Sequence, residues 1–198
     1  HKPENIGKFK ENFYKRLAFD EIFSTFLVNS EIRKKIKKFK KNKKRFDTKK
    51  QNEMISKLDF SLTNDQNKTL NEINRDLSSD NKMFRLLQGD VGSGKTIVAL
   101  CAAANVVKSG FQVAIMAPTE ILARQHFDLE KKIFDKNIIL EILSSKTEYK
   151  KKKIIISKLK EKKIDIIFGT HAIFQKKILF NKLGLIIIDE QHKFGVNQ

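Results

Sequence analysis

Cysteine, proline and glycine are scarce in this chain of 198 residues, which contains one, two and eight of them, respectively. A single cysteine, Cys101, cannot form an internal disulfide, which excludes a secreted disulfide scaffold and indicates a reducing compartment. The few prolines and glycines exclude collagen-like and linker-like chains. The longest apolar run, residues 97–104, is far shorter than the roughly 18–20 residues that span a bilayer, and no signal-peptide pattern opens the chain. We therefore expect a cytoplasmic protein without a membrane partner. Its first residue, His1 instead of Met, predicts a fragment.

Acidic residues are also few, since 23 Asp and Glu face 41 Lys and Arg and leave a net charge of +18. Lys occurs 35 times and Arg six times, beside 24 Ile and 14 Asn. Their joint excess is what an AT-rich genome produces, so part of the charge reflects codon bias. The rest creates a positive field that attracts phosphate backbones. Both interpretations, codon bias and a nucleic-acid partner, remain open at this point.

The charge divides the chain into two parts. Residues 1–57 hold 18 basic and seven acidic residues, and the remainder holds 23 and 16. This contrast places a boundary near residues 47–57 and predicts a basic helical connector over residues 1–54 before a main domain over residues 55–198. Apolar spacing in the connector predicts an amphipathic helix over 8–28 and a second helix over 30–44. Twelve of the 18 residues from 33 to 50 are basic, which fits either a solvated helix face with a linker or a strip that follows phosphates.

Apolar runs alternate with helical stretches after the boundary. The pattern predicts strands at 83–88, 112–117, 138–143, 164–168 and 185–188, helices at 96–107, 120–134 and 148–161, and a short helix or turn at 171–176. The strands lack polar alternation, which is typical of a parallel sheet covered by helices on both faces. The expected fold class is therefore α/β.

A phosphate-binding loop carries the clearest chemistry. The motif reads GDVGSGKT and joins a predicted strand to a predicted helix, as a P-loop does. Glycines let backbone N–H groups turn toward phosphate oxygens, and the helix adds its positive N-terminal end. Lys95 would bridge the β- and γ-phosphates and the Thr96 hydroxyl would ligate Mg²⁺. The loop consists of Gly89, Asp90, Val91, Gly92, Ser93, Gly94, Lys95 and Thr96.

Two carboxylates follow the last predicted strand, at the carboxyl end where α/β folds bind ligands. Asp189 would hold Mg²⁺, through water, and Glu190 would polarise the attacking water, because water is a poor nucleophile unless it is oriented and partly deprotonated. Together with the P-loop they predict a nucleoside-triphosphate site. No Cys/His cluster supports zinc, and the pair Gln125 and His126 is expected to lie exposed on a helix.

Four segments in order, RLLQGDVGSGKT, MAPTEILARQH, FGTHAIFQ and GLIIIDEQHKFGVNQ, resemble the first motor domain of the RecG family of bacterial branched-DNA helicases, in superfamily 2. LDFSLTNDQ resembles the family's adenine-recognition segment, and KRLAFDEIF its connection between wedge domain and motor, so the resemblance covers essentially the whole chain. It implies a RecA-like sheet whose Ser/Thr-Ala-Thr strand, normally between the P-loop strand and the Asp-Glu strand, is missing at the C-terminus. The wedge and the second RecA-like domain are expected to be absent too.

The resemblance also implies roles for particular residues. Gln66 would read the adenine edge with Phe60 nearby, although Thr63 and Gln66 also form a capping box that could be their only role. Pro118 and Thr119 would contact the DNA backbone, although Thr119 could be only an N-cap. Gln191 and His192 would relay the state of the γ-phosphate, so that the catalytic set is Lys95, Asp189, Glu190, Gln191 and His192. The second expected DNA contact comprises Gly169, Thr170 and His171.

The function that these residues and the resemblance imply is an ATP- and Mg²⁺-dependent DNA helicase or translocase. It would act on stalled forks, Holliday junctions and R-loops in recombination and repair, as a monomer. The isolated chain is expected to hydrolyse ATP very poorly and to unwind nothing. A translocase of the transcription-repair coupling type (the Mfd family) is one alternative, although that family typically carries Asp-Glu-Glu-His where this chain has Asp189-Glu190-Gln191-His192. A nucleotide-dependent binding module without turnover, or a generic basic DNA-binding module, is another.

Overall fold

A computed structural model describes residues 4–38, 52, 55–56, 58–134 and 137–190. The chain forms two compact units, residues 1–43 with 79–86 and residues 44–78 with 87–198. The predicted boundary at residues 47–57 falls mostly outside the described residues.

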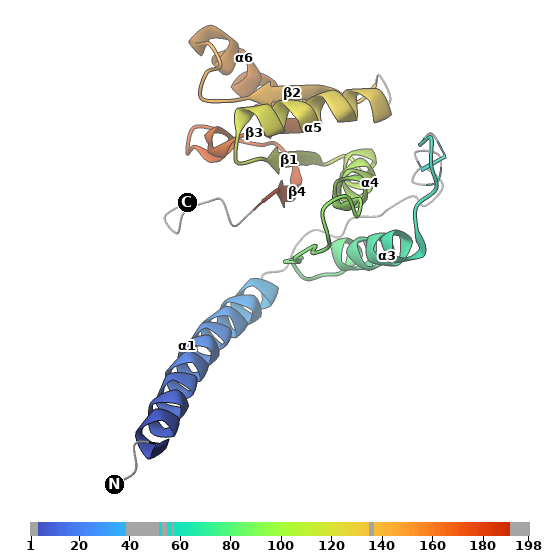
Figure 1. Cartoon of the computed structure of the whole chain (residues 1–198). Helices are drawn as coiled ribbons and strands as arrows, with labels where there is room; N and C mark the ends of the chain where they lie inside the picture. The colour runs from blue at the N-terminus through green and yellow to red at the C-terminus, as the bar shows by residue number, and fades with distance from the viewer. Residues whose placement is uncertain (1–3, 39–51, 53–54, 57, 135–136, 191–198) are drawn as a thin grey trace. The chain divides into compact units, whose positions relative to one another are not determined.

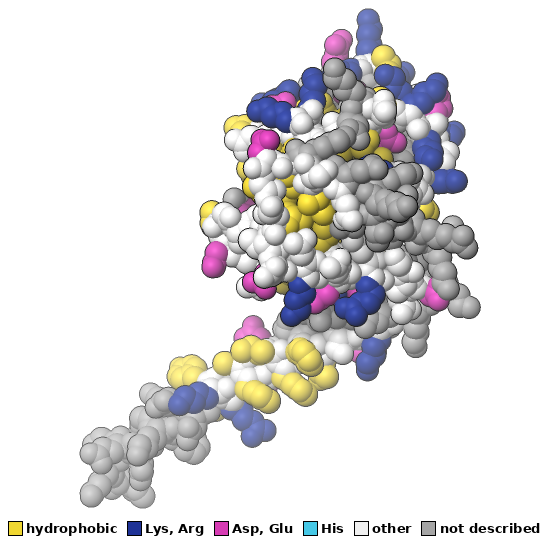
Figure 2. Space-filling view, turned by 90° about the vertical axis from the view of Figure 1, so that its right-hand side faces the viewer, with side chains coloured by type: hydrophobic (Ala, Val, Ile, Leu, Met, Phe, Trp, Pro, Cys, Tyr) yellow, Lys and Arg dark blue, Asp and Glu magenta, His cyan; other side chains and the backbone are white. Residues whose placement is uncertain are grey.

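The N-terminal unit contains one long helix, α1 (Glu4–Lys38). The predicted interruption between residues 28 and 30 is therefore wrong, because Asn29 and Ser30 disfavour a helix only slightly and no glycine or proline stands there to end it. The last residues of the predicted second helix, 39–44, lie outside the described residues. Figure 2 shows hydrophobic side chains along α1 with basic ones between them. Its exposed large apolar residues are Phe13, Tyr14, Leu17, Phe19, Ile22, Phe23, Phe26, Leu27, Val28 and Ile32.

A parallel sheet of four strands forms the centre of the second unit (Figure 1). The spatial order is β2-β3-β1-β4, and every neighbouring pair is parallel, as predicted. Its strands are β1 (Gln112–Met116), β2 (Leu140–Leu143), β3 (Ile166–Gly169) and β4 (Leu183–Ile188). The carboxyl ends of all four strands therefore lie along one edge of the sheet, where the site is expected.

Helices cover both faces of the sheet, as the apolar strands predict. On one face, Phe127 of α5 (Glu120–Ile133) packs edge-on against Phe168 of β3. The opposite face carries α6 (Tyr149–Lys160) and the short helix η1 (His171–Phe174). Strand residues alternate between faces, and the cluster on this second face consists of Ala114, Met116, Leu143, Ile155, Leu159, Ile164, Ile167, Ile173 and Ile178.

Two further helices lead toward the predicted nucleotide site. They are α3 (Asn64–Ser78) and α4 (Lys95–Lys108), and they pack against each other. The α4 helix also contacts β1 and β4 through an almost completely buried, alanine-rich stretch. No helix in the described ranges is long and apolar enough to cross a membrane.

The predicted strand at residues 83–88 is not formed. These residues have no regular structure, and the side chains of Phe84 and Leu86 are exposed to 65% and 72%. An apolar run becomes a strand only where a neighbouring strand completes its hydrogen bonds. No strand of the described residues does this for the run, so its hydrophobicity alone does not produce a strand.

Glu130 is the most unusual side chain of the core. It lies on α5 with no exposed surface, and neither carboxyl oxygen has a hydrogen-bond partner in the described part of the chain. Burial in this apolar surrounding raises its pKa well above the ordinary 4.5, because desolvation disfavours the charged form. The folded chain therefore keeps this carboxyl protonated over a pH range in which the same group of the unfolded chain is ionised.

Replacing this side chain by an apolar one of similar size should stabilise the fold. Above pH 4.5 the unfolded carboxyl loses its proton while the folded one keeps it, so wild-type stability falls as the pH rises toward the folded pKa. We expect Glu130→Met to increase the free energy of unfolding, with a gain that grows by at most about 1.4 kcal/mol per pH unit. Urea unfolding at pH 4.5, 6 and 7.5 measures this. An equal gain at all three values would contradict the assignment, and Asp128→Asn on the exposed side of α5 is the control.

Candidate functional site

The predicted P-loop lies between residue 89 and the start of α4. Gly92 and Gly94 have φ values of 82° and 80°, in the left-handed region that favours glycine. The Lys95 side chain turns back into the loop, where its Nζ donates to the backbone oxygens of Gly89 and Asp90 at 2.8 Å each. A triphosphate would replace these two carbonyls as the partner of the ammonium group. The loop therefore has the backbone turns and the cation that phosphate binding requires.

Gln66 connects this loop to the start of α3. Its Oε1 accepts from the Thr63 backbone N–H at 2.9 Å and its backbone N–H donates to the Thr63 hydroxyl, which completes the predicted capping box. Its Nε2 donates to the Ser93 carbonyl of the P-loop at 2.9 Å. Capping is therefore only one of the contacts that this side chain makes. The adenine-reading role stays a prediction.

Two of the three P-loop glycines, Gly92 and Gly94, provide a matched pair for testing this connection. A methyl group at Gly92 meets nothing, whereas at Gly94 it collides with the Gln66 amide. Gly92→Ala should lower the free energy of unfolding by about 1–2 kcal/mol, because the alanine must adopt a left-handed backbone conformation. Gly94→Ala should lower it by about 1 kcal/mol more, because the Gln66 amide must give up its hydrogen bond to Ser93. Thermal unfolding in the wild-type and Gln66→Ala backgrounds measures the difference. If Gly94→Ala still costs more stability than Gly92→Ala in the Gln66→Ala background, the collision with Gln66 is not the cause.

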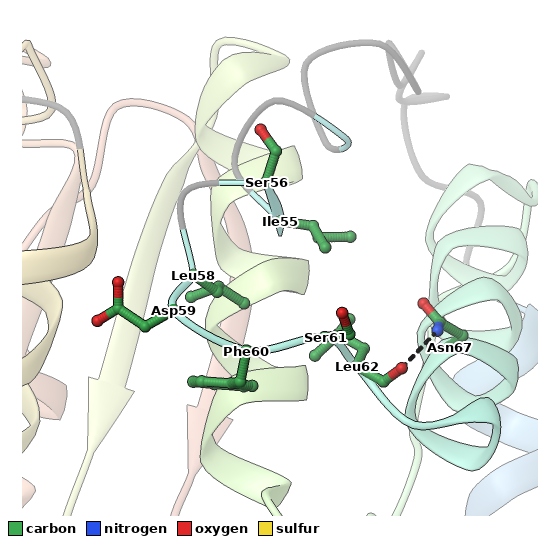
Figure 3. A pocket seen from close by; sticks show the side chains of 8 residues that line it. All are labelled: Ile55, Ser56, Leu58, Asp59, Phe60, Ser61, Leu62 and Asn67. Atoms are coloured by element: carbon green, nitrogen blue, oxygen red, sulfur yellow. Dashed lines mark hydrogen bonds between the residues drawn. The ribbon is translucent and has the colours of Figure 1, made fainter.

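A hollow of about 390 Å³ borders the segment before α3 (Figure 3). Phe60 lines this hollow and is 51% exposed. Asn67 donates from Nδ2 to the Leu62 carbonyl at 3.1 Å and so ties the segment to α3. The hollow is lined by Ile55, Ser56, Leu58, Asp59, Phe60, Ser61, Leu62 and Asn67. An aromatic ring at an open hollow, next to the helix that carries Gln66, is an arrangement that could accept a nucleobase.

Asp189 and Glu190 directly follow β4 at the carboxyl edge of the sheet. The Asp189 backbone N–H donates to the Met116 carbonyl at 2.8 Å, which continues the ladder with β1. Glu190 is exposed and has a φ of 50°, so the chain turns sharply at this point. The other two residues of the motif, Gln191 and His192, lie outside the described residues.

The prediction for His126 is wrong, although Gln125 is exposed as expected. The His126 side chain is only 15% exposed, and its Nε2 lies 2.8 Å from Oδ2 of Asp189. A carboxylate only accepts hydrogen bonds, so the imidazole N–H is the donor. The contact joins residues 63 positions apart. No local pattern could have revealed this contact. The pairing of β4 with β1, which leads into α5, brings the two residues together.

The residues present fit a magnesium ion that is held mainly by phosphates and water. Among the described residues, no group of three or more His, Cys, Asp or Glu side chains could form a complete metal cage. Mg²⁺ bound to a nucleotide needs only one or two protein ligands. Thr96 lies in the first turn of α4, and Asp189 keeps its second oxygen, Oδ1, without a hydrogen-bond partner in the described ranges. One hydroxyl and one carboxylate are the donors that such an ion requires.

The two predicted DNA-contacting segments follow β1 and β3. Thr119 is exposed and caps α5, since its Oγ1 accepts from the Leu122 backbone N–H at 3.2 Å. Its hydroxyl hydrogen remains available to donate to a phosphate. Pro118, half-buried, precedes it. The capping function is therefore present, and the DNA contact stays a prediction.

The second segment is more buried than its predicted role implies. A methyl group at Gly169 would collide with the Leu143 carbonyl and the Ile173 side chain, so close packing requires glycine here. Thr170 is buried, and its hydroxyl has no hydrogen-bond partner in the described part of the chain. His171 alone is exposed. Of the three, it is therefore the side chain that a phosphate could reach.

Fold and site together have the architecture of a RecA-like P-loop domain. A profile of the DEAD/DEAH box helicase family matches residues 63–198, and the chain belongs to this family. RecG of Aquifex aeolicus is 44% identical over 100% of this chain and 26% of its own length. RecG of Thermotoga maritima is 44% identical over 96% of this chain and 25% of its own length. The resemblance to RecG helicases predicted from the motifs is confirmed.

A solved structure agrees with the sequence relatives. The structure of RecG bound to a three-way DNA junction superimposes with a TM-score of 0.83, at 43% identity, over 91% of this chain and 25% of that one. This match confirms the RecA-like fold. The chain spans about a quarter of the length of the curated relatives described above.

Proposed function

We propose that the chain forms the ATP-binding part of a RecG-type helicase or translocase that remodels branched DNA. Its substrates would be stalled forks, Holliday junctions and R-loops, and its processes recombination and repair. The observation that carries the proposal is an intact P-loop, with Lys95 turned into it, in a chain that matches RecG along nearly its whole length. The alternative of a transcription-repair coupling translocase is not favoured, because the relatives found over the whole chain are RecG helicases.

Nucleotide binding would use the P-loop and the hollow beside α3. Backbone N–H groups of the loop and the N-terminus of α4 would surround the phosphates, and Lys95 would exchange its carbonyl partners for phosphate oxygens. The base would stack on Phe60, with Gln66 reading its edge from the start of α3. Because Gln66 also holds Ser93, base and phosphates would contact one connected group of residues.

Hydrolysis would depend on the carboxylates after β4. Magnesium, when bound, would supply positive charge that offsets the negative charge of the phosphates. Thr96 and Asp189 would hold it. The exposed Glu190 would accept a proton from the attacking water. Its presence argues against a module that binds nucleotide without turnover.

DNA contacts would lie at the same carboxyl edge, at Pro118, Thr119 and the exposed His171. The motor would act as a monomer in a bacterial cytoplasm, with a wedge domain and a second RecA-like domain supplied by the same polypeptide. That second domain would contribute arginine fingers, which are worth about 10³–10⁵ in rate. By itself, the chain described here is therefore expected to bind nucleotide but turn it over very slowly.

A chimera tests the whole proposal. Residues 1–198 replace the matching quarter of Thermotoga maritima RecG, and unwinding of a labelled three-way DNA junction is followed with and without ATP. We expect ATP-dependent unwinding that Lys95→Ala and Glu190→Gln abolish in the same chimera. A chimera that is folded and binds ATP and the junction, yet leaves the junction intact, would refute the proposed activity.

A further inference from the structure

His126 and Asp189 form a hydrogen-bonded pair that the nucleotide-site motifs do not include. The His126 Nε2–H donates to Oδ2 of Asp189 at 2.8 Å, and the two side chains are 15% and 35% exposed. A hydrogen bond to a carboxylate that is partly shielded from water is stronger than one between neutral groups. It therefore restricts the carboxylate to one orientation.

Two hydrogen bonds from one continuous segment of the chain hold Asp189. The backbone N–H of Asp189 already donates to the Met116 carbonyl at the end of β1. After β1 the chain passes through Pro118 to the N-cap Thr119 of α5, and His126 follows seven residues later on the same helix. Both bonds that fix Asp189 therefore come from the continuous β1–α5 unit. The backbone bond places the residue, and the imidazole sets the rotation of its side chain.

We propose that His126 is a positioning residue that orients Asp189 for magnesium. By holding Oδ2, it leaves Oδ1 available to accept from a metal-bound water, so that the carboxylate would lose less rotational freedom when the ion binds. The inference rests on the proposed function, because it requires that Mg²⁺–nucleotide binds at the P-loop. Asp189 would be the residue that contacts the ion through water, whereas His126 acts only through Asp189.

Two amide replacements provide a sharp test on the chain as it stands. The amide of Gln can place its nitrogen near the position of the imidazole Nε2, whereas Asn is one methylene shorter and cannot reach Asp189. The measurement is the ratio of affinities for a fluorescent ATP analogue with saturating Mg²⁺ and with EDTA. We expect His126→Asn to reduce this ratio about five- to tenfold, His126→Gln to restore most of it, and Gln125→Ala, on the exposed side of the same turn, to leave it unchanged.

Combining variants at the two positions tests whether His126 orients Asp189 or only packs in the fold. If His126 acts only through Asp189, His126→Asn should reduce the ratio no further in an Asp189→Asn background. A lower melting temperature with an unchanged ratio for both amide variants would overturn the proposal and make His126 a packing residue. An additional loss in the Asp189→Asn background would also overturn it. If the unmodified chain binds no analogue, or binds it as well after Lys95→Ala, the proposed function itself fails.

Discussion

Lys95→Ala should weaken binding of Mg²⁺–ATP by about 100-fold, which corresponds to about 2.8 kcal/mol. In the structure the ammonium group already lies inside the P-loop, 2.8 Å from the backbone oxygens of Gly89 and Asp90. Phosphate oxygens would replace two neutral acceptors by charged ones, and charge-assisted bonds are roughly twice as strong. Removing the ammonium group takes away this gain and leaves the loop with backbone donors only. Isothermal titration with a non-hydrolysable ATP analogue measures the loss.

The control must lose the same charge at a place that binds nothing. Lys131, exposed near the end of α5, is suited to this because Lys131→Ala changes the net charge equally. We expect less than a twofold change for this variant at physiological salt, where distant charges are screened. Equal losses for both variants would mean that a general positive field attracts the nucleotide, and the P-loop assignment would be wrong.

Gly169→Ala should destabilise the fold by about 3 kcal/mol, since overpacking a close contact costs about 1–3 kcal/mol or more. An added methyl group would collide with the Leu143 carbonyl of the neighbouring strand and with the Ile173 side chain. The first of these is backbone within the β2–β3 ladder and cannot move aside. For a chain of this size, the loss corresponds to a fall in melting temperature of roughly 10 °C.

Gly110→Ala is the control variant, because it introduces backbone strain without a steric collision. Gly110 has a φ of 81°, and a methyl group there would meet only the end of the Lys162 side chain at an ordinary contact distance. We expect this variant to lower the free energy of unfolding by about 1–2 kcal/mol, because of the left-handed backbone alone. If Gly169→Ala melts no lower than Gly110→Ala, the strands at Gly169 leave room for a methyl group and the inferred collision does not occur. The glycine in the Gly-Thr-His segment would then need another explanation, such as close approach of a DNA phosphate.

Much of the fold was predictable because its signals are local. Four strands and the helices α4, α5 and α6 lie within a few residues of their predicted positions. The strands are apolar on both faces, and Thr119 caps α5 as its position before a helical stretch implies. The P-loop was equally predictable, since Gly92 and Gly94 adopt backbone angles that other residues rarely reach.

The errors arise where an outcome depends on distant parts of the chain. Residues 83–88 have the composition of a strand, but no strand in the described part of the chain pairs with them. Residues 28–30 interrupt the apolar spacing without containing a helix breaker, so α1 continues through them. The His126–Asp189 contact and the burial of Glu130 depend on how α5 lies on the sheet, which no short motif encodes.

The most direct test of the central claim is equilibrium binding of a fluorescent ATP analogue to the 198-residue chain, with Mg²⁺ present, in competition with unlabelled ATP and GTP. The account predicts saturable binding that requires Lys95. We also expect ATP to displace the analogue at least tenfold better than GTP, because Phe60 and Gln66 would accept the adenine base. Binding that is absent, or that survives Lys95→Ala, would contradict the assignment of the P-loop as a nucleotide site. Equal displacement by GTP would contradict the adenine-reading role of the residues before α3.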